Sequence, residues 1–165
     1  MSFVPGWYLL YTKPKHERKV ALQLTRMNIS LFLPESKVVK QWHDRKKVIE
    51  APLFPSYVFV FVDKMEHYYN SLDCDGVLYW VRFGKEIARV REETINSLRF
   101  LVNEGRNLEV SSERFNPGQK LVIHRGAFSG LDCEVVEHRN DKKVLVRIKI
   151  LNRNVLADLS HSLIA

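Results

Sequence analysis

Hydrophobic and polar residues in the first half of the chain alternate in a way that predicts a sheet covered by helices. The run LFPSYVFVFV at residues 53–62 carries no charge, and its aromatic residues at 57, 59 and 61 alternate with valines. Successive residues of a strand point to opposite faces of a sheet, so this segment is apolar on both faces. Such a strand is typical of the middle of a covered sheet. We therefore predict a central strand at residues 57–62, with helices over at least one face.

The segments around this strand supply its predicted neighbours. WYLLYTK at residues 7–13 is rich in aromatic residues and is followed by a proline, which indicates a strand. Residues 16–27 carry apolar residues four and three positions apart, the spacing of one helix face. The charged tract HDRKK at residues 43–47 separates two strand-like runs and predicts the tip of a hairpin.

The same kind of pattern continues to residue 104. A short helix is predicted at residues 66–73, a strand at residues 76–84, and a helix with an apolar stripe from Glu92 onward. This mixture of strands and helices predicts a compact α+β sandwich over residues 1–104.

The rest of the chain has a different pattern. A polar stretch that ends in a Pro-Gly turn predicts a linker, which we place at residues 105–115. Short strand-like runs separated by turns follow over residues 116–165. Several short strands in so few residues predict a small barrel, because a sheet closed on itself has no unpaired edge.

The charge of the chain is basic and unevenly spread. Net charge is +7, and residues 1–50 hold ten Lys and Arg against four Asp and Glu. A surface of this kind suits a polyanion such as nucleic acid. Ordinary solvated charges on a protein surface are the alternative explanation.

Other features of composition narrow the class of protein. No apolar stretch reaches the roughly 20 residues that cross a bilayer, and no signal-peptide pattern is present, so we expect a soluble cytoplasmic protein without a membrane partner. Cys74 and Cys133 have no CxxC spacing, which predicts two buried or half-buried thiols. We expect no disulfide framework, no metal site and no cofactor.

Motifs of common enzyme classes are missing from the sequence. It has no P-loop, no nucleophile elbow, no HExxH and no glycine pattern for dinucleotides. Glu35, Asp44 and Glu50 would suit a metal-dependent nuclease, but they lie among basic residues in the predicted hairpin. Surface ion pairs are the better explanation for these acids, so we expect a protein that is not an enzyme.

Three blocks of sequence resemble the NusG family of transcription elongation factors. They occur in the family's order and are GWYLLYTKPKHERKV, LFPSYVFV and FNPGQKLVIHRGAFSGLDCEVVEH. The resemblance implies a NusG N-terminal domain, which is an α/β sandwich, followed by a KOW domain, which is an SH3-like β-barrel. Ser56 and Cys133 stand where the family usually has glycine. Within the family, YLLYTK and WVRFG are similar to RfaH, and WHDRKK is similar to the UpxY-type antiterminators of polysaccharide operons.

The resemblance also implies a function. A member of this family would bind RNA polymerase as a monomer and suppress pausing and termination, here at particular polysaccharide-type operons. A KOW module that binds the ribosome or RNA is the alternative, but such a module does not need the first domain. Phe128, in the implied barrel, would recruit the ribosome or a termination factor, unless its ring folds back over the barrel.

Two sets of residues are implied to contact the polymerase. The main apolar patch comprises Tyr11, Phe54, Phe83, Ile95 and Leu98. A smaller set would reach the opposite lobe of the polymerase and comprises His67, Tyr68 and Asn70. For Phe54, which is framed by prolines, a role as a cap on the domain's own core remains open.

Basic residues after the first strand are implied to face the non-template DNA strand of the transcription bubble. They are Lys13, Lys15, His16, Arg18 and Lys19. Lysine and arginine bind phosphates, but a solvated helix face would have the same composition. The HDRKK tip is a further candidate for contact with DNA or polymerase, and Trp42 beside it either anchors a partner or packs on the domain.

Overall fold

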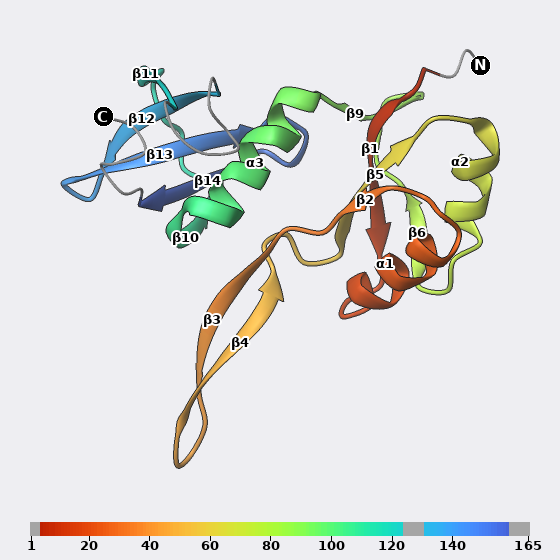
Figure 1. Cartoon of the computed structure of the whole chain (residues 1–165), viewed down its shortest axis with the longest axis horizontal. Coiled ribbons are helices and arrows are strands. Elements are labelled where there is room, and N and C mark those ends of the chain that lie inside the picture. The colour runs from red at the N-terminus through yellow and green to blue at the C-terminus, as the bar shows by residue number, and fades with distance from the viewer. Residues whose placement is uncertain (1–3, 124–130, 159–165) are drawn as a thin grey trace. The chain divides into compact units, whose positions relative to one another are not determined.

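The computed structural model describes residues 4–123 and 131–158, and the chain divides into two units, residues 1–92 and 93–165 (Figure 1). The first unit is built on an antiparallel sheet in the order β2-β5-β1-β6, with β9 also paired to β1. Its strands are β1 (Gly6–Thr12), β2 (Leu31–Phe32), β5 (Tyr57–Val62), β6 (Val77–Trp80) and β9 (Arg89–Val90). Strand β5 lies between β2 and β1, which confirms the predicted central strand.

Two helices cover one face of this sheet. They are α1 (Glu17–Arg26) and α2 (Met65–Leu72). Val20 and Leu24 of α1 pack against Leu10 and Val58 in a buried cluster. The predicted helical spacing is therefore confirmed, and α1 ends where Asn28 takes a left-handed backbone conformation with φ of 57°.

Strands β3 (Glu35–Gln41) and β4 (Lys46–Pro52) form a separate two-stranded hairpin, which extends away from the sheet of the first unit in Figure 1. The backbone N–H of Trp42 donates to the carbonyl of Arg45 across the tip, at 2.8 Å. The predicted hairpin is confirmed. Lys46 and Lys47, the last two residues of the HDRKK tract, belong to β4 and not to the tip.

The strand predicted at residues 76–84 is interrupted. Strand β6 ends at Trp80, and β7 (Arg82–Phe83) pairs instead with β8 (Glu86–Ile87) around a turn at Gly84. Gly84 has φ of 59°, a conformation that glycine adopts without steric cost, so the chain reverses there.

The second unit contains a five-stranded antiparallel sheet in the order β10-β14-β13-β12-β11. The helix α3 (Glu92–Glu104) precedes it, and a 3₁₀ turn (Lys149–Leu151) joins β13 to β14. The strands are β10 (Arg106–Ser111), β11 (Gln119–Val122), β12 (Asp132–His138), β13 (Asp141–Ile148) and β14 (Arg153–Asp158). Among the residues that the structure describes, no pairing joins β10 to β11, so barrel closure stays a prediction.

The segment predicted as a linker, residues 105–115, is in part a strand. Val110 and Ser111 of β10 pair with Val155 and Asn154 of β14. Only Gly105 separates α3 from β10, and the units divide after Glu92, earlier than the boundary at residue 104 that the pattern predicts. The polar composition of β10 concealed the strand because one face of an antiparallel sheet can be solvated.

Two further observations concern the cysteines and the lengths of the helices. Cys74 and Cys133 are both buried, as predicted. No helix within residues 4–123 and 131–158 is long and apolar enough to span a membrane.

Candidate functional site

The turn Leu53–Ser56 joins the hairpin to the central strand and is held at several points. The N–H of Leu53 donates to the carbonyl of Pro34 at 2.8 Å, and the carbonyl of Ser56 accepts from the N–H of Thr12 at 2.7 Å. The buried carboxylate of Glu17, on α1, accepts the N–H of Ser56 at 2.7 Å. Because strand, helix and hairpin all fix this turn, it is not a free loop.

This turn buries Phe54, which corrects its assignment to an exposed patch. The ring is 4% exposed and meets Phe59 of the central strand edge to face, with centroids 6.1 Å apart. The backbone bonds of the turn direct the ring toward the sheet, so the alternative of a core cap describes Phe54 better. The prolines on either side of Phe54 correctly indicated a rigid loop. They did not indicate whether the ring of Phe54 points toward the sheet or toward solvent.

Three other residues of the predicted polymerase surface are also buried. Ile95 and Leu98, three positions apart on α3, are fully enclosed. Tyr68 of α2 stacks on Trp80 with centroids 5.5 Å apart. A helix that packs on one face must bury its apolar stripe, so this stripe serves the fold and is closed to a partner in this structure.

An aromatic surface nevertheless remains open on the first unit. Tyr57, Tyr11 and Tyr79 face one another across β5, β1 and β6, and we call these three residues the tyrosine row. The ring of Tyr11 stacks on Tyr79 at 4.9 Å and tilts against Tyr57 at 5.2 Å. Tyr79 is 53% exposed, whereas Tyr11 and Tyr57 are half-buried.

Sequence reasoning found Tyr11 and missed its two partners. A signal was present, because Tyr57 begins the alternating aromatic face of the central strand and Tyr79 occupies an equivalent face of the strand predicted at residues 76–84. Only the register, which sets Tyr11 opposite both tyrosines, shows that the three form one surface.

The remaining predicted contacts lie apart in the fold. Phe83 is 62% exposed on β7, as a docking residue would be. His67 is half-buried, and its Nδ1 lies 2.7 Å from a carboxylate oxygen of Asp63. Asn70 is half-buried, and its carbonyl accepts a bond from the thiol of Cys74 at 3.6 Å. With Tyr68 buried, the second predicted polymerase contact reduces to His67 and Asn70.

The loop between β1 and α1 presents two free lysines. Lys13 and Lys15 are exposed, and neither makes a side-chain hydrogen bond or ion pair among the described residues; we call this the lysine loop. The N–H of Lys13 donates to the carbonyl of Gly76 at 2.8 Å. A Cβ at Gly76 would come within 2.9 Å of His16, so glycine permits the close packing that holds the loop.

The two basic residues further along α1 are engaged within the fold. Arg18 donates through Nε to the carboxylate of Glu35 at 3.1 Å and through Nη2 to the carbonyl of Glu50 at 2.7 Å. The hydrogen bond to Glu35 raises the pKa of Arg18. Lys19 pairs with Asp75 and lowers the pKa of that carboxyl. Of the five predicted nucleic-acid contacts, Lys13 and Lys15 are therefore the most available.

The β3–β4 hairpin is a second exposed, basic part of the first unit. Val39 and Val48 face each other across it and are 62% and 59% exposed. Trp42 at the tip is exposed, and the ammonium of Lys47 lies 5.9 Å from its ring centre. Lys40 lies directly opposite Lys47. Trp42 therefore does not pack on the domain. Of the two alternatives for this residue, the exposed ring fits the one in which Trp42 is accessible to a partner.

The acids of the hairpin do not form a metal site. Glu35 is paired with Arg18, as expected of a surface ion pair. Within the described residues, no three His, Cys, Asp or Glu side chains gather so that they could hold a metal ion.

Sequence comparison identifies the family of this fold. The model of the family described as transcription termination factor NusG matches residues 5–99, more than half of the 165 residues. The chain belongs to the NusG family. NusG of Streptococcus pyogenes serotype M1, a transcription termination/antitermination protein, is 25% identical over 158 residues, which cover 88% of this chain and 87% of the relative.

Other relatives are similarly distant. NusG of Lactococcus lactis subsp. lactis is 24% identical, covering 88% of this chain and 84% of its own. The solved structure of Thermotoga maritima NusG is 21% identical and covers 96% of this chain and 94% of that chain, with a TM-score of 0.49. The family model and these curated relatives are described as transcription termination or antitermination proteins.

The departure at Ser56 has a structural consequence. Ser56 has φ of 72°, in the left-handed region that favours glycine. Glycine, the residue that the resemblance implies at this position, would adopt the turn without strain. Cys133, the other departure, is buried on β12. Phe128, the predicted contact of the KOW domain, lies outside the described residues.

Proposed function

We propose that this chain is a transcription antitermination and elongation factor that binds RNA polymerase through the tyrosine row and suppresses pausing and termination. The observation that carries the proposal is the open, stacked pair of Tyr11 and Tyr79 on the first unit of a NusG-family protein. Its RNA polymerase partner follows from family membership and the resemblance in sequence.

The tyrosine row has the properties of a docking surface. Tyrosine is enriched at the centres of protein interfaces, and each aromatic ring offers roughly 150–250 Å² of surface for burial. Because Tyr11 is already stacked on Tyr79 and packed against Tyr57, its ring has little rotamer freedom left to lose on binding. Phe83 is a second exposed aromatic residue that supports this assignment.

The lysine loop and the hairpin would contact nucleic acid, in particular the non-template DNA strand. Lys13 and Lys15 form no close ion pair among the described residues, so no such pair must break when they bind phosphate. Lys40, Lys47 and the ring of Trp42 give the hairpin both charge and a stacking surface. Arg18 has a supporting role, because it braces the hairpin against α1.

We infer that these contacts act together by favouring one conformation of the polymerase. A protein shifts such an equilibrium only by as much as it binds one state better than the other. Binding at the tyrosine row and on DNA at once would disfavour the opened, paused state. His67 and Asn70 would supply a weaker second contact with the polymerase.

The proposal extends to a specialised role at polysaccharide-type operons. Its support is the similarity of WVRFG and WHDRKK to the specialised members of the family. Transcription through a terminator, with and without an upstream leader element of the cognate operon, tests this extension. Equal read-through on both templates would indicate a general factor instead. The second unit, as a KOW barrel, would recruit the ribosome or a termination factor through Phe128.

Replacement of one exposed tyrosine tests the main proposal. Tyr79→Ala is expected to weaken binding to core RNA polymerase at least about tenfold, because interface tyrosines often contribute more than 1.4 kcal/mol. Leu22→Ala is the control, since Leu22 on α1 is 52% exposed and lies outside both proposed polymerase contacts.

Binding is measured with the intact chain, and thermal unfolding of both variants checks that they fold. Equal affinities for the two variants, with normal unfolding, would remove the tyrosine row from the proposal. A loss confined to Tyr79→Ala, accompanied by restored pausing in a single-round transcription assay, would support it.

A further inference from the structure

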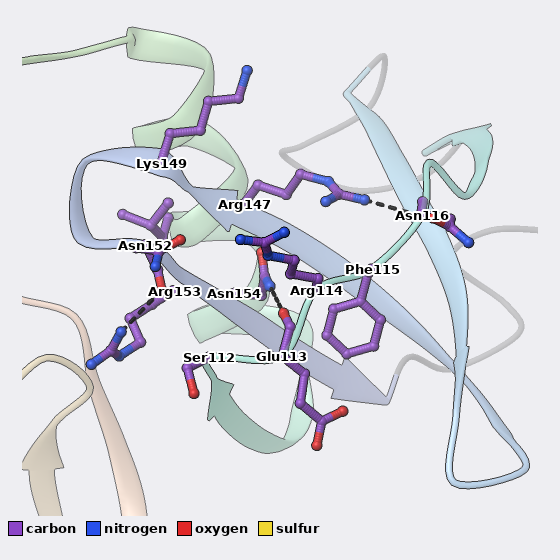
Figure 2. A pocket seen from close by; sticks show the side chains of 11 residues that line it. Ser112, Glu113, Arg114, Phe115, Asn116, Arg147, Lys149, Asn152, Arg153 and Asn154 are labelled. Atoms are coloured by element: carbon purple, nitrogen blue, oxygen red, sulfur yellow. Dashed lines mark hydrogen bonds between the residues drawn. The ribbon is translucent and has the colours of Figure 1, made fainter.

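The second unit contains a basic pocket to which the proposed function assigns no role. The pocket has a volume of about 370 Å³ and lies between residues 112–116 and the β13–β14 connection (Figure 2). Four cationic side chains line it: Arg114, Arg147, Lys149 and Arg153. Glu113 is its single acidic residue, and in Figure 2 the Glu113 carboxylate points away from the Arg114 guanidinium.

One of the four cations builds the wall of the pocket. Arg147 forms a two-pronged ion pair with Glu134, at 3.1 and 2.8 Å, and also donates to the carbonyl of Asn116 at 3.0 Å. The hydrogen bond from Arg147 lowers the pKa of Glu134, so this carboxylate stays ionised and cancels the charge of Arg147. Arg147 therefore positions the backbone at Asn116 and is not available to a ligand.

The other three cations have no carboxylate partner in the described parts of the chain. Arg153 donates only to backbone carbonyls, at 3.0 Å to Asn152 and 3.5 Å to Leu151. Arg114 and Lys149 make no side-chain hydrogen bond or ion pair there, and both are exposed. A ligand that binds these three groups would therefore not have to break an ion pair, although the pocket carries excess positive charge.

We propose that this pocket binds the phosphodiester backbone of a single nucleic-acid strand. Guanidinium and ammonium groups bind phosphate oxygens. The amides of Asn116 and Asn152 and the hydroxyl of Ser112 line the same pocket and supply further donors of the kind that contact phosphate and sugar. The site is separate from the lysine loop and does not depend on binding to RNA polymerase.

The arrangement favours a strand over a small anion. Figure 2 shows the side chains of Arg114, Lys149 and Arg153 pointing in different directions, so the three groups do not converge on one point as a site for a single compact anion would. Contacts with exposed cations are individually weak, because water and salt screen them. A strand gains by presenting successive phosphates to successive cations.

An acidic peptide fits the pocket less well. Protein interfaces depend on apolar anchors, and the apolar residues here are committed to the fold. Ile148 is buried, and the half-buried Phe115 packs against Val136 and Leu145 of the sheet. The pocket therefore offers charge and amide groups, and none of its apolar side chains is fully exposed.

The test compares two triple variants of the full chain. The pocket variant carries Arg114→Gln, Lys149→Gln and Arg153→Gln. The control variant carries Arg106→Gln, Lys120→Gln and Lys142→Gln, which remove the same charge from exposed residues outside the pocket. Both are made in a chain that already has Lys13→Gln and Lys15→Gln, so that binding at the lysine loop does not mask the result.

Binding of labelled single-stranded RNA and DNA of one sequence is measured by fluorescence anisotropy over a range of salt concentrations. The pocket variant is expected to bind at least about fivefold more weakly than the control, with the slope of log K against log salt smaller by about 2. Thermal unfolding confirms that both variants fold. Equal loss in the two variants would overturn the proposal.

A second measurement uses the unmodified chain and does not depend on variants. The side-chain N–H resonances of Arg114 and Arg153 are followed by NMR during titration with the oligonucleotides, inorganic phosphate or poly-glutamate. Shifts that saturate with an oligonucleotide at far lower phosphate concentration than with inorganic phosphate support the strand. Equal response to inorganic phosphate, or a stronger response to poly-glutamate, would overturn it. A response to RNA alone or to DNA alone would identify the strand that binds.

Discussion

The β1–β5 pair and the β3–β4 hairpin are both antiparallel and both contain valines, yet the surroundings of these valines are opposite. Val58 and Val60 in β5 are fully buried beneath α1 and α2. Val39 and Val48 in the hairpin face each other in solvent. Apolar alternation therefore indicates a strand but does not determine its burial, because burial needs a second layer to cover the strand.

This difference in burial gives the two strand pairs of the first unit different structural roles. The covered pair provides a rigid support that presents the tyrosine row on strands and the lysine loop at the end of β1. The hairpin has no second layer, and an isolated two-stranded hairpin is marginally stable in water. Its attachments are at its base, through Pro34, Glu35 and Glu50. Its far end is left available for a partner.

The largest expected effect comes from one matched pair of valine substitutions. Val60→Ala should lower the free energy of unfolding by about 2–3 kcal/mol, because it removes methyl groups from a filled core. Val48→Ala should change it by less than about 0.5 kcal/mol, because that side chain is already in water. Urea denaturation of both variants measures the difference, and similar losses would contradict the contrast between the two strand pairs.

The next effect concerns the joint between the two regions. Glu17→Ala removes the acceptor of the buried Ser56 N–H and should cost about 2 kcal/mol, the range for a lost bond to a charged group. Glu17→Gln keeps a side-chain oxygen and should recover most of that loss. Chemical denaturation provides the measurement, and Glu66→Ala on the exposed side of α2 is the control. Full stability of Glu17→Ala would mean that the turn is held by its other bonds alone.

A smaller effect of opposite sign is expected at the same turn. Ser56→Gly should raise the free energy of unfolding by roughly 0.5–1 kcal/mol, because relief of the left-handed conformation outweighs the added freedom of the unfolded chain. The melting temperature of the variant measures this gain. Destabilisation would show that Ser56 carries a compensating interaction.

The smallest global effect is expected where the hairpin meets α1. Arg18→Gln breaks the bonds to Glu35 and Glu50 on the surface, so global stability should hardly change. Local opening of the hairpin should increase, and amide hydrogen exchange in β3 and β4 should speed up several-fold relative to β5. Lys19→Gln removes a comparable surface pair and is the control. Equal exchange in the two variants would exclude a bracing role for Arg18.

Much of the fold was predictable from local pattern. The uncharged alternation of residues 57–62, the helical spacing of residues 16–27 and the charged tip near residue 43 identified a central strand, a covering helix and a hairpin. Strand β10 was missed because its residues are mostly polar, and its pairing partner β14 lies far along the chain. The local residue pattern of a strand says little about a pairing partner that lies far along the chain.

The candidate site was predictable only in part. Tyr11, Lys13 and Lys15 lie where a partner can reach them. Phe54 and Leu98 were predicted to belong to the same apolar contact surface as Tyr11, but the structure buries both. The pocket in the second unit is formed by two segments that are well separated in sequence, so no local motif predicted it.

The sequence by itself determined the element types, the basic character and membership of the NusG family, because these depend on local periodicity, residue counts and ordered motifs. Tertiary structure alone decided which aromatic rings are buried, which lysines lack carboxylate partners and which tyrosines share a surface. The physical reason is that burial and pairing belong to contacts between segments. Those contacts depend on strand register and on helix packing, which no single segment specifies.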